Sequence, residues 1–139
     1  MGLVHAEIEL VRTADLVLFE ENIIKEDQIK KMTVTALVDS GAYMLAINET
    51  VKAQLDLRFI DEQIAELADG SKVKLEIVGP VEVRFGNRST TCRAVVLPGD
   101  AEILLGAIPM EDMDVIIHPR EQKMMVNPKS PNYAQKSLK

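Results

Sequence analysis

One short segment carries residue types that could do chemistry together: Asp39, Ser40 and Gly41 follow the apolar run Ala36–Val38. A carboxylate held at the end of a strand can act as a general acid or base. Gly41 would let backbone N–H groups approach that carboxylate, and the Ser40 hydroxyl would brace the loop. The same three residue types also form ordinary turns because they bond their own backbone, so the tripeptide alone leaves a purely structural turn open.

Other kinds of site lack the residues they need. His5 and His118 lie far apart, neither has metal-ligand spacing, and Cys92 is the single cysteine, so we do not expect a structural zinc site. The chain has no glycine-rich phosphate loop and no nucleophile-elbow motif, although counting residues leaves a Ser-His-Asp triad open. We expect neither a metal nor a cofactor.

Length and composition indicate a single globular domain. The chain has 139 residues, of which 47% are hydrophobic and 27% charged, the balance of an ordinary globular protein. Aromatic residues make up only 4% and tryptophan is absent, so the core must consist of Val, Ile, Leu, Met and Ala. A chain of this length can bury a core without disulfides or metals.

Charge and cysteine usage restrict the expected partners and location. The 16 basic and 22 acidic residues give a net charge of −6, and an acidic surface repels phosphate backbones, so we expect no nucleic-acid partner. The lone Cys92 cannot form an internal disulfide, which is typical of a reducing compartment. The first residues do not read as a signal peptide, and no apolar run is long enough for a membrane span. We therefore expect a cytoplasmic protein without membrane association.

Alternating apolar and polar residues predict several short, half-buried strands. The turns between them are expected at Asp69-Gly70, the strongest hairpin signal, and at Gly86-Asn87. Many short strands with turn punctuation favour a mostly β barrel or sandwich. The expected strands cover residues 3–11, 32–38, 81–85, 88–97, 102–105, 115–117 and 123–126, with a hairpin over 63–78.

Helical signals are few. Asn48 is expected to cap a short helix that runs through Leu55. Pro109 is expected at the first position of a second short helix that ends at Asp114, because proline needs no N–H partner there.

Two segments are harder to interpret. Residues 14–31 are compatible with a helix, a hairpin or an inserted loop. The end of the chain contains Pro128, Pro131 and scattered lysines, which is typical of a mobile tail. We therefore expect one domain over residues 1–127, with 14–31 as a possible insertion, followed by a tail over 128–139.

The order of three features resembles the retropepsin-like aspartic proteases, and in particular the small single-domain bacterial and archaeal members of clan AA. These features are Asp39-Ser40-Gly41-Ala42, the hairpin tip 67–71, and the apolar strand 102–106 that closes on glycine. The resemblance covers Leu3 to Pro128 and leaves out residues 14–31 and the tail. One departure is His118 before Pro119, where the family more often has Asp; we place this histidine outside the catalytic centre.

The resemblance implies a closed, mostly β acid-protease barrel with one or two short helices, which works as a homodimer. Each subunit would contribute one loop to a site on the twofold axis. Asp39 would be the catalytic aspartate, Ser40 would bond across to the partner loop, Gly41 would lie beside the carboxylate, and Ala42 would be the small residue that follows.

The resemblance also implies two supporting elements. A flap would close over the substrate, with Asp69, Gly70 and Ser71 at its tip. A strand containing Leu104, Leu105 and Gly106 would pack beneath the catalytic loop.

The implied activity is that of an aspartic endopeptidase, which hydrolyses a peptide or unfolded protein substrate with water activated by two Asp39 carboxylates. No other Asp in the chain is followed by Ser-Gly or Thr-Gly, so a monomer would hold half a site. The alternative is a non-catalytic peptide-binding or assembly module on the same fold.

Two other side chains have weaker signals. Tyr43 follows Ala42 directly, and it could border a substrate pocket or lie at the edge of the core. Cys92 lies in an alternating strand and is expected to be a small buried residue without a nucleophilic role.

Overall fold

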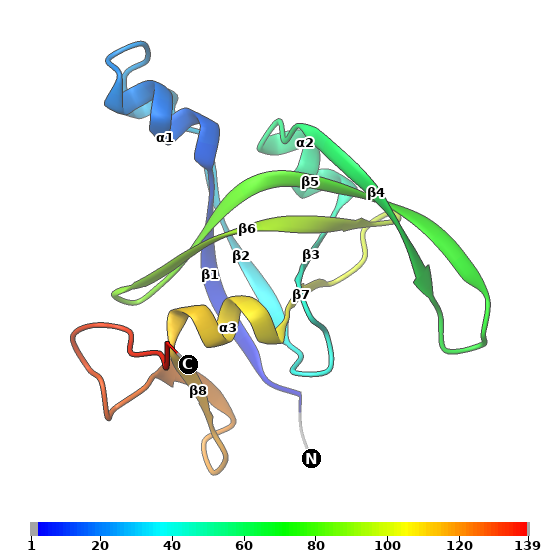
Figure 1. Ribbon diagram of the computed structural model, residues 1–139, viewed down its shortest axis with the longest axis vertical. Coiled ribbons are helices and arrows are strands. Elements are labelled where there is room, and N and C mark those ends of the chain that lie inside the picture. The colour runs from blue at the N-terminus through cyan, green and yellow to red at the C-terminus, as the bar shows by residue number, and fades with distance from the viewer. Residues whose placement is uncertain (1–2, 139) are drawn as a thin grey trace.

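The computed structural model describes residues 3–138 and forms a closed six-stranded β barrel (Figure 1). Neighbouring strands follow the order β1-β2-β7-β3-β6-β5, and pairing of β1 with β5 closes the barrel. The mostly β acid-protease barrel expected from the sequence is therefore confirmed. The strands are β1 (His5–Arg12), β2 (Lys31–Val38), β3 (Leu45–Asn48), β4 (Phe59–Glu66), β5 (Lys72–Phe85), β6 (Arg88–Leu97) and β7 (Ile103–Leu105), with β8 (Val115–His118) and β9 (Lys123–Val126) in a separate two-stranded sheet.

Three α-helices accompany the strands in the described chain, where the sequence predicted one or two. They are α1 (Thr13–Glu20), α2 (Glu49–Gln54) and α3 (Ala107–Met113). The predicted cap of α2 is confirmed, because Asn48 Oδ1 accepts a hydrogen bond of 2.9 Å from the Val51 N–H. Helix α3 begins two residues earlier than predicted, so Pro109 occupies its third position, where a missing N–H is still tolerated. None of these helices is long and apolar enough to cross a membrane.

The barrel core is aliphatic, as the composition predicts. Along β1, Ala6, Ile8 and Leu10 point into the core while Glu7 lies outside. Every fully buried member of the core cluster is Ala, Val, Ile, Leu or Met. Each large aliphatic side chain buried in this way contributes about 2 kcal/mol.

Strand β7 lies between β2 and β3, and this arrangement creates the loop of most interest. It is parallel to β2 and antiparallel to β3. The chain that leaves β2 must therefore pass over the end of β7 to reach β3, which it does through residues 39–44. The sequence did not predict β3, because four residues are too few to show a period.

Strand β5 is one strand of 14 residues, where the sequence predicted two strands separated at Pro80. The pairing with β6 shifts register between Val78 and Val81. A β-bulge is a position where a proline without an N–H can be accommodated inside a sheet. The first half of β5 pairs with β4 as a hairpin beside the barrel, and the second half pairs with β1.

The β1–β2 hairpin carries residues 13–30 at its tip as α1 followed by a 3-10 turn (Glu26–Gln28). Asp15 ties this appendage together: its carboxylate accepts hydrogen bonds from Arg12 Nη1 at 2.5 Å and from the Lys30 N–H at 2.8 Å. Burial opposes ionisation of Asp15, but these donors outweigh it and hold the pKa of the carboxyl below its ordinary value. Of the three alternatives, the structure shows a helix in this segment, and whether the segment is an insertion stays a prediction.

Candidate active site

The loop over residues 39–44, hereafter the Asp39 loop, is fixed by backbone hydrogen bonds at its first residue. The Asp39 N–H donates to the Leu105 carbonyl at 3.0 Å, which joins the end of β2 to the end of β7. The Ala42 N–H donates back to the Asp39 carbonyl at 3.1 Å, which closes a turn. Asp39 is therefore held at the point where two parallel strands end side by side.

The Asp39 carboxylate is oriented by its own loop. Its Oδ1 accepts a hydrogen bond of 2.9 Å from the Gly41 N–H. A Cβ at Gly41 would lie 3.2 Å from the same oxygen, so glycine gives the loop its close approach to the carboxylate. The side chain is half-buried, which leaves it accessible from the open side of the loop.

Helix α3 holds the other side of the Asp39 loop. The Ala107 N–H donates to the Ala42 carbonyl at 2.8 Å, and the Ile108 N–H donates to the Tyr43 carbonyl at 2.9 Å. Gly106, at the start of the helix, leaves no space for a side chain, since its Cβ would lie 2.4 Å from the Met44 carbonyl oxygen.

Strand β7 lies beneath the loop. Leu105 is fully buried and pairs with Val38 of β2 and Leu45 of β3. Leu104, one residue earlier, is half-buried and pairs with Leu37. The structure thus brings together the residues predicted around Asp39 and those predicted on the supporting strand.

Ser40 lies at the exposed tip of the Asp39 loop. Within the described chain its hydroxyl has no hydrogen-bond partner, whereas the neighbouring Gly41 N–H and Asp39 carboxylate bond to each other. The hydroxyl can therefore donate to, or accept from, a group outside the monomer.

The predicted flap is the hairpin of β4 and the first half of β5, here called the flap hairpin (residues 59–78). At its tip the Leu67 N–H donates to the Ser71 carbonyl at 2.7 Å, and Gly70 adopts a φ of 86°. Asp69 Oδ1 accepts from the Ser71 hydroxyl at 2.5 Å and from its N–H at 2.9 Å, and these bonds lower the pKa of the Asp69 carboxyl. Asp69 therefore stabilises the turn itself.

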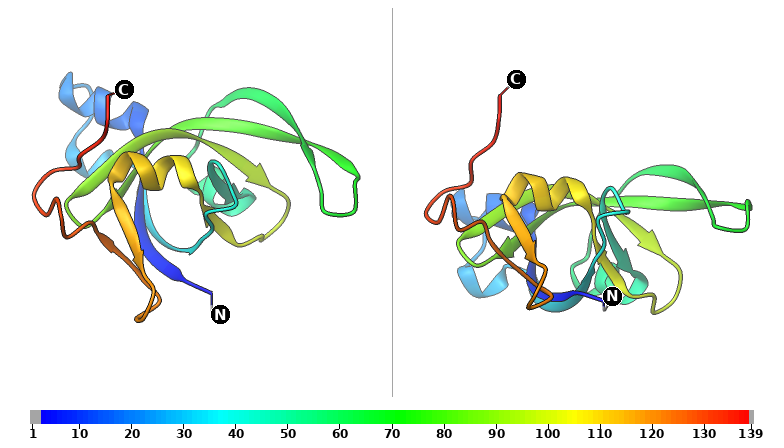
Figure 2. Two further views of the ribbon diagram at one scale, coloured as in Figure 1. Left: turned by 60° about the horizontal axis from the view of Figure 1, so that its bottom comes forward. Right: turned by 90° about the horizontal axis from the view of Figure 1, so that it is seen from below.

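The flap hairpin stands clear of the barrel in every view (Figure 2). Its tip is not in contact with the Asp39 loop, so the structure does not bring Asp69, Gly70 or Ser71 to the carboxylate. Towards the tip the large apolar side chains are correspondingly exposed, as for Ile64 at 67% and Leu67 at 49%, whereas Leu75 and Ile77 nearer the barrel are buried.

Two cavities lie between the base of the flap hairpin and the Asp39 loop. The first, of about 210 Å³, is mainly apolar, and the second, of about 160 Å³, is charged; they share Met44 and Gln63. The first is lined by Ala42, Tyr43, Met44, Leu45, Ala46, Gln63 and Val95. The second is lined by Met44, Asp61, Glu62, Gln63, Ile77 and Arg93.

Most of these lining residues were missed by the sequence analysis. Met44 and Ala46 share one face of the chain entering β3, and Arg93 and Val95 share one face of β6, since side chains alternate along a strand. The parallel pairing of Leu45 with Ala94 places the two faces side by side. The sequence reveals neither the short strand β3 nor its pairing with β6.

The structure resolves the two interpretations of Tyr43. This side chain is 77% exposed and lines the apolar cavity, so it borders that cavity and does not lie at the edge of the core. The two cavities together are called the groove below.

Other chemistry-bearing residues lie away from Asp39. Burial, together with the negative charge of Asp112, raises the pKa of the Cys92 thiol to about 11, which keeps it protonated and a poor nucleophile. His118 Nδ1 accepts a hydrogen bond of 3.1 Å from the Glu121 N–H in the β8–β9 turn. Among residues 3–138, no group of three or more His, Cys, Asp or Glu side chains is arranged to hold a metal ion.

The sequence matches the family model described as aspartyl protease over residues 27–123. This range covers more than half of the chain and includes the Asp39 loop, the flap hairpin and β7. The protein belongs to the retropepsin-like aspartyl protease family. No curated protein matches the sequence.

Proposed function

We propose that the protein is an aspartic endopeptidase that works as a homodimer, with one Asp39 from each subunit at the catalytic centre. The observation that carries this proposal is the position of Asp39, at the end of β2 in a loop held by both β7 and α3. Each chain has one such loop, so a second copy must supply the second carboxylate. Membership of the aspartyl protease family supports hydrolysis as the reaction.

The chemistry follows from placing two carboxylates together. At a separation of about 3 Å they cannot both ionise at low cost, so the pair shares one proton. The ionised Asp39 takes a proton from water, whose oxygen attacks the peptide carbonyl carbon, while the protonated Asp39 of the other subunit donates to the carbonyl oxygen. The tetrahedral diol then collapses, the C–N bond breaks, and a proton passes to the leaving amine. The two carboxyl groups titrate as a pair.

The groove supports an extended peptide, or an unfolded segment of protein, as the substrate. A peptide backbone can pair with strand edges while its side chains alternate into pockets. The apolar cavity beside Tyr43 and Met44 suits an aliphatic side chain, and the cavity containing Asp61 and Arg93 suits a polar one. Closure of the flap hairpin over the peptide would exclude bulk water from the dyad.

Cleavage of an unfolded substrate tests the proposal. A denatured protein and a peptide library are incubated from acidic to neutral pH with the native chain, with Asp39→Asn, and with Asp27→Asn as the control. Asp27 is an exposed aspartate on the β1–β2 appendage. We expect cleavage by the native chain and by Asp27→Asn only. Equal cleavage by Asp39→Asn would remove Asp39 from the mechanism.

A non-catalytic peptide-binding or assembly module is the second candidate. It is favoured by the fact that a single chain already contains both cavities and the flap hairpin, whereas it contains only one carboxylate of a dyad. Sedimentation separates the two candidates, since a protein that stays strictly monomeric at tens of micromolar cannot form the dyad and would fit the binding module.

The remaining partner and location assignments stay predictions. The net charge of −6 argues against nucleic acid, and the unpaired Cys92 is compatible with a cytoplasmic location.

A further inference from the structure

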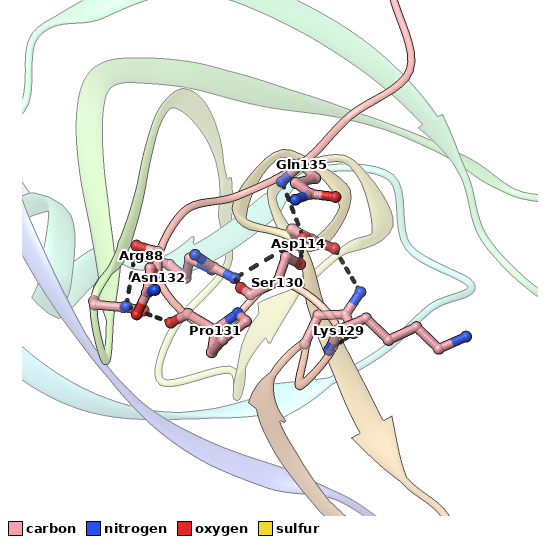
Figure 3. A network of polar contacts seen from close by, with 9 residues as sticks. Arg88, Asp114, Lys129, Ser130, Pro131, Asn132 and Gln135 are labelled. Atoms are coloured by element: carbon pink, nitrogen blue, oxygen red, sulfur yellow. Dashed lines mark hydrogen bonds and ion pairs between the residues drawn. The ribbon is translucent and has the colours of Figure 1, made fainter.

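The chain beyond β9 is tied to the end of α3 by polar contacts centred on Asp114 (Figure 3). The Asp114 carboxylate accepts hydrogen bonds from the Ser130 hydroxyl, from Asn127 Nδ2 at 3.0 Å and from the Gln135 N–H at 3.0 Å. Arg88 Nη2 lies 3.9 Å from the same carboxylate and donates to the Ser130 carbonyl. Two of the three hydrogen-bond donors to Asp114, Ser130 and Gln135, therefore come from the segment that the composition alone describes as a tail, and the third, Asn127, directly precedes it.

Asp114 also has an unusual backbone conformation. It ends α3 with φ 55° and ψ 56°, the left-handed region, which is unfavourable for a residue with a side chain and persists where the surroundings hold it. Its carbonyl accepts a further hydrogen bond of 3.2 Å from the Asn127 N–H. The contacts with the C-terminal segment thus fix the direction in which the chain leaves α3.

The opposite end of α3 holds the Asp39 loop. The helix has seven residues and so is about 10 Å long. At its first turn the N–H groups of Ala107 and Ile108 donate to the carbonyls of Ala42 and Tyr43. One short, stiff element therefore connects Asp114 to the loop that positions Asp39.

The C-terminal segment contacts α3 through polar groups. The inner face of the helix is buried through Pro109, Met110 and Met113. Between the outer face and residues 135–137 lies a cavity of about 550 Å³, bridged by the ion pair of 2.7 Å between Lys136 and Asp112. The ion pair and the hydrogen bonds to Asp114 are therefore the contacts that hold the segment to α3.

The buried guanidinium of Arg88 is only partly satisfied in the closed arrangement, because Nη2 donates to the Ser130 carbonyl while its other nitrogens do not find acceptors in the described chain. Arg88 is 3% exposed, and its Nε and Nη1 find no hydrogen-bond partner within residues 3–138. Buried donors without an acceptor are costly, and they regain hydrogen bonds when water reaches them. If separation of the segment lets water reach these atoms, their hydration offsets part of the loss of the bond from Nη2 to the Ser130 carbonyl.

We propose that residues 127–136 form a C-terminal latch, positioned by Asp114, that holds the Asp39 loop through α3. With the latch closed, both ends of α3 are fixed and the loop carbonyls keep their helix partners. With the latch open, the helix end and the Asp39 loop become more mobile. The effect on catalysis rests on the proposed protease function, whereas the coupling from the latch to the loop does not.

Amide hydrogen exchange tests the coupling directly. Exchange of the Ala107 and Ile108 N–H groups reports on the hydrogen bonds between α3 and the Asp39 loop. Exchange of the Gln135 N–H reports on its hydrogen bond to Asp114 in the latch. In Ser130→Ala and Asp114→Asn we expect about tenfold faster exchange at all three amides, with Val83 in the barrel core unchanged. Ser89→Ala, an exposed serine on β6, is the matched control and should change none of them.

The contrary result is equally specific. If Gln135 exchanges faster in these variants while Ala107 and Ile108 keep their native rates, the latch opens without reaching the loop and the proposal is wrong. If Val83 accelerates by the same factor as Ala107, the variants act through global stability, and the positioning role is likewise overturned. Point substitutions are used because a chain ending at Val126 could fail to fold.

Once a peptide that the protein cleaves has been identified, kcat and KM give a second readout. Loss of the latch misplaces the Asp39 loop, which carries the carboxylate and, through residues 42–44, one wall of the apolar cavity. We therefore expect kcat to fall about fivefold in Ser130→Ala and KM to rise with it. An unchanged kcat with accelerated exchange at Ala107 would refute the catalytic role of the latch. If native chain and Asp39→Asn cleave alike, the protease proposal fails, and the exchange result still decides the coupling.

Discussion

Gly106 lies directly against the backbone of Ala42: a Cβ at Gly106 would be 2.8 Å from the Ala42 carbonyl oxygen. The same carbonyl accepts a hydrogen bond of 2.8 Å from the Ala107 N–H. The close approach of the two backbones allows this hydrogen bond, and it also leaves no space for a side chain at residue 106. Real Cβ atoms do not approach a backbone oxygen this closely, and the atoms in the way are backbone atoms of residues 42–44. The shape of the Asp39 loop therefore depends on a residue more than 60 positions later in the sequence.

Gly106→Ala should displace the Asp39 loop. The methyl group has no space unless the loop or α3 moves, so we expect a loss of about 3 kcal/mol in the free energy of unfolding and loss of any cleavage activity. Denaturant unfolding measures the first and the peptide assay the second. Gly99→Ala is the control: its Cβ meets nothing within 4 Å, and the φ of 62° should cost only about 1 kcal/mol. If Gly106→Ala had the stability of the native protein, the Asp39 loop would be able to move aside for the methyl group without cost.

The local parts of the site were predictable from sequence because each depends on neighbouring residues. Asn48 caps α2 through a bond to Val51, three residues on, and the hairpin turn at Asp69-Gly70 forms within five residues. The order of the Asp39 segment, the hairpin and the strand ending at Gly106 was likewise sufficient to indicate the family. These signals lie within short stretches of chain or in their order.

What the sequence did not reveal depends on which strands pair. Strand β3 was missed because Leu45, Ala46 and Ile47 are all buried and show no alternation. The groove walls follow from the pairing of β3 with β6, and the latch follows from contacts between Asp114 and residues 127–135. A segment with prolines and lysines has the composition of a mobile tail whether or not it is anchored. Only its tertiary contacts show that residues 127–136 are held against α3.

Ser40 should contribute to association and not to the stability of the monomer. Its hydroxyl has no partner within the described chain, so Ser40→Ala should leave the free energy of unfolding of the monomer within about 0.5 kcal/mol. If each hydroxyl bonds across the twofold axis for about 1 kcal/mol, two lost bonds raise the dimer Kd about thirtyfold. Sedimentation equilibrium measures this change.

Ser40→Thr is the matched variant, because it keeps the hydroxyl and adds a methyl group. We expect it to retain both the dimer and the cleavage activity. Complete loss of the dimer in Ser40→Thr would mean that the Asp39 loop has been placed wrongly relative to the partner.

Asp15 should stabilise the appendage without affecting the active site. Its carboxylate receives charge-assisted bonds from Arg12 and Lys30, so Asp15→Asn should cost about 2 kcal/mol at pH 7. The folded-state pKa lies below the ordinary value, so the contribution is present above about pH 4 and is lost as the pH falls through the folded pKa. The difference between the two proteins in denaturant unfolding should therefore shrink at pH 3. Cleavage should not change, because eight residues of β2 separate the appendage from Asp39.

The latch should remain closed in mild acid and open only near pH 2. Hydrogen bonds from Ser130, Asn127 and Gln135, together with the charge of Arg88, lower the pKa of the Asp114 carboxyl to about 2. Since the ionised form is the one that accepts these bonds, its stabilisation is complete above about pH 4 and disappears as the pH falls through 2. The chemical shift of the Gln135 N–H in an NMR titration follows this carboxyl directly.

Two other charges face the same region, and they provide the control for that titration. Asp112 pairs with Lys136, and this contact, with a bond from Thr90, lowers the pKa of the Asp112 carboxyl. Lys136→Ala should therefore leave unchanged the titration midpoint of Asp114 that is followed at the Gln135 N–H. Ser130→Ala should raise this midpoint, because the hydrogen bond from the Ser130 hydroxyl is the strongest of those that favour ionised Asp114. A midpoint near 4 in the native protein would equal that of an ordinary carboxyl. It would show that the hydrogen bonds around Asp114 do not hold the latch closed.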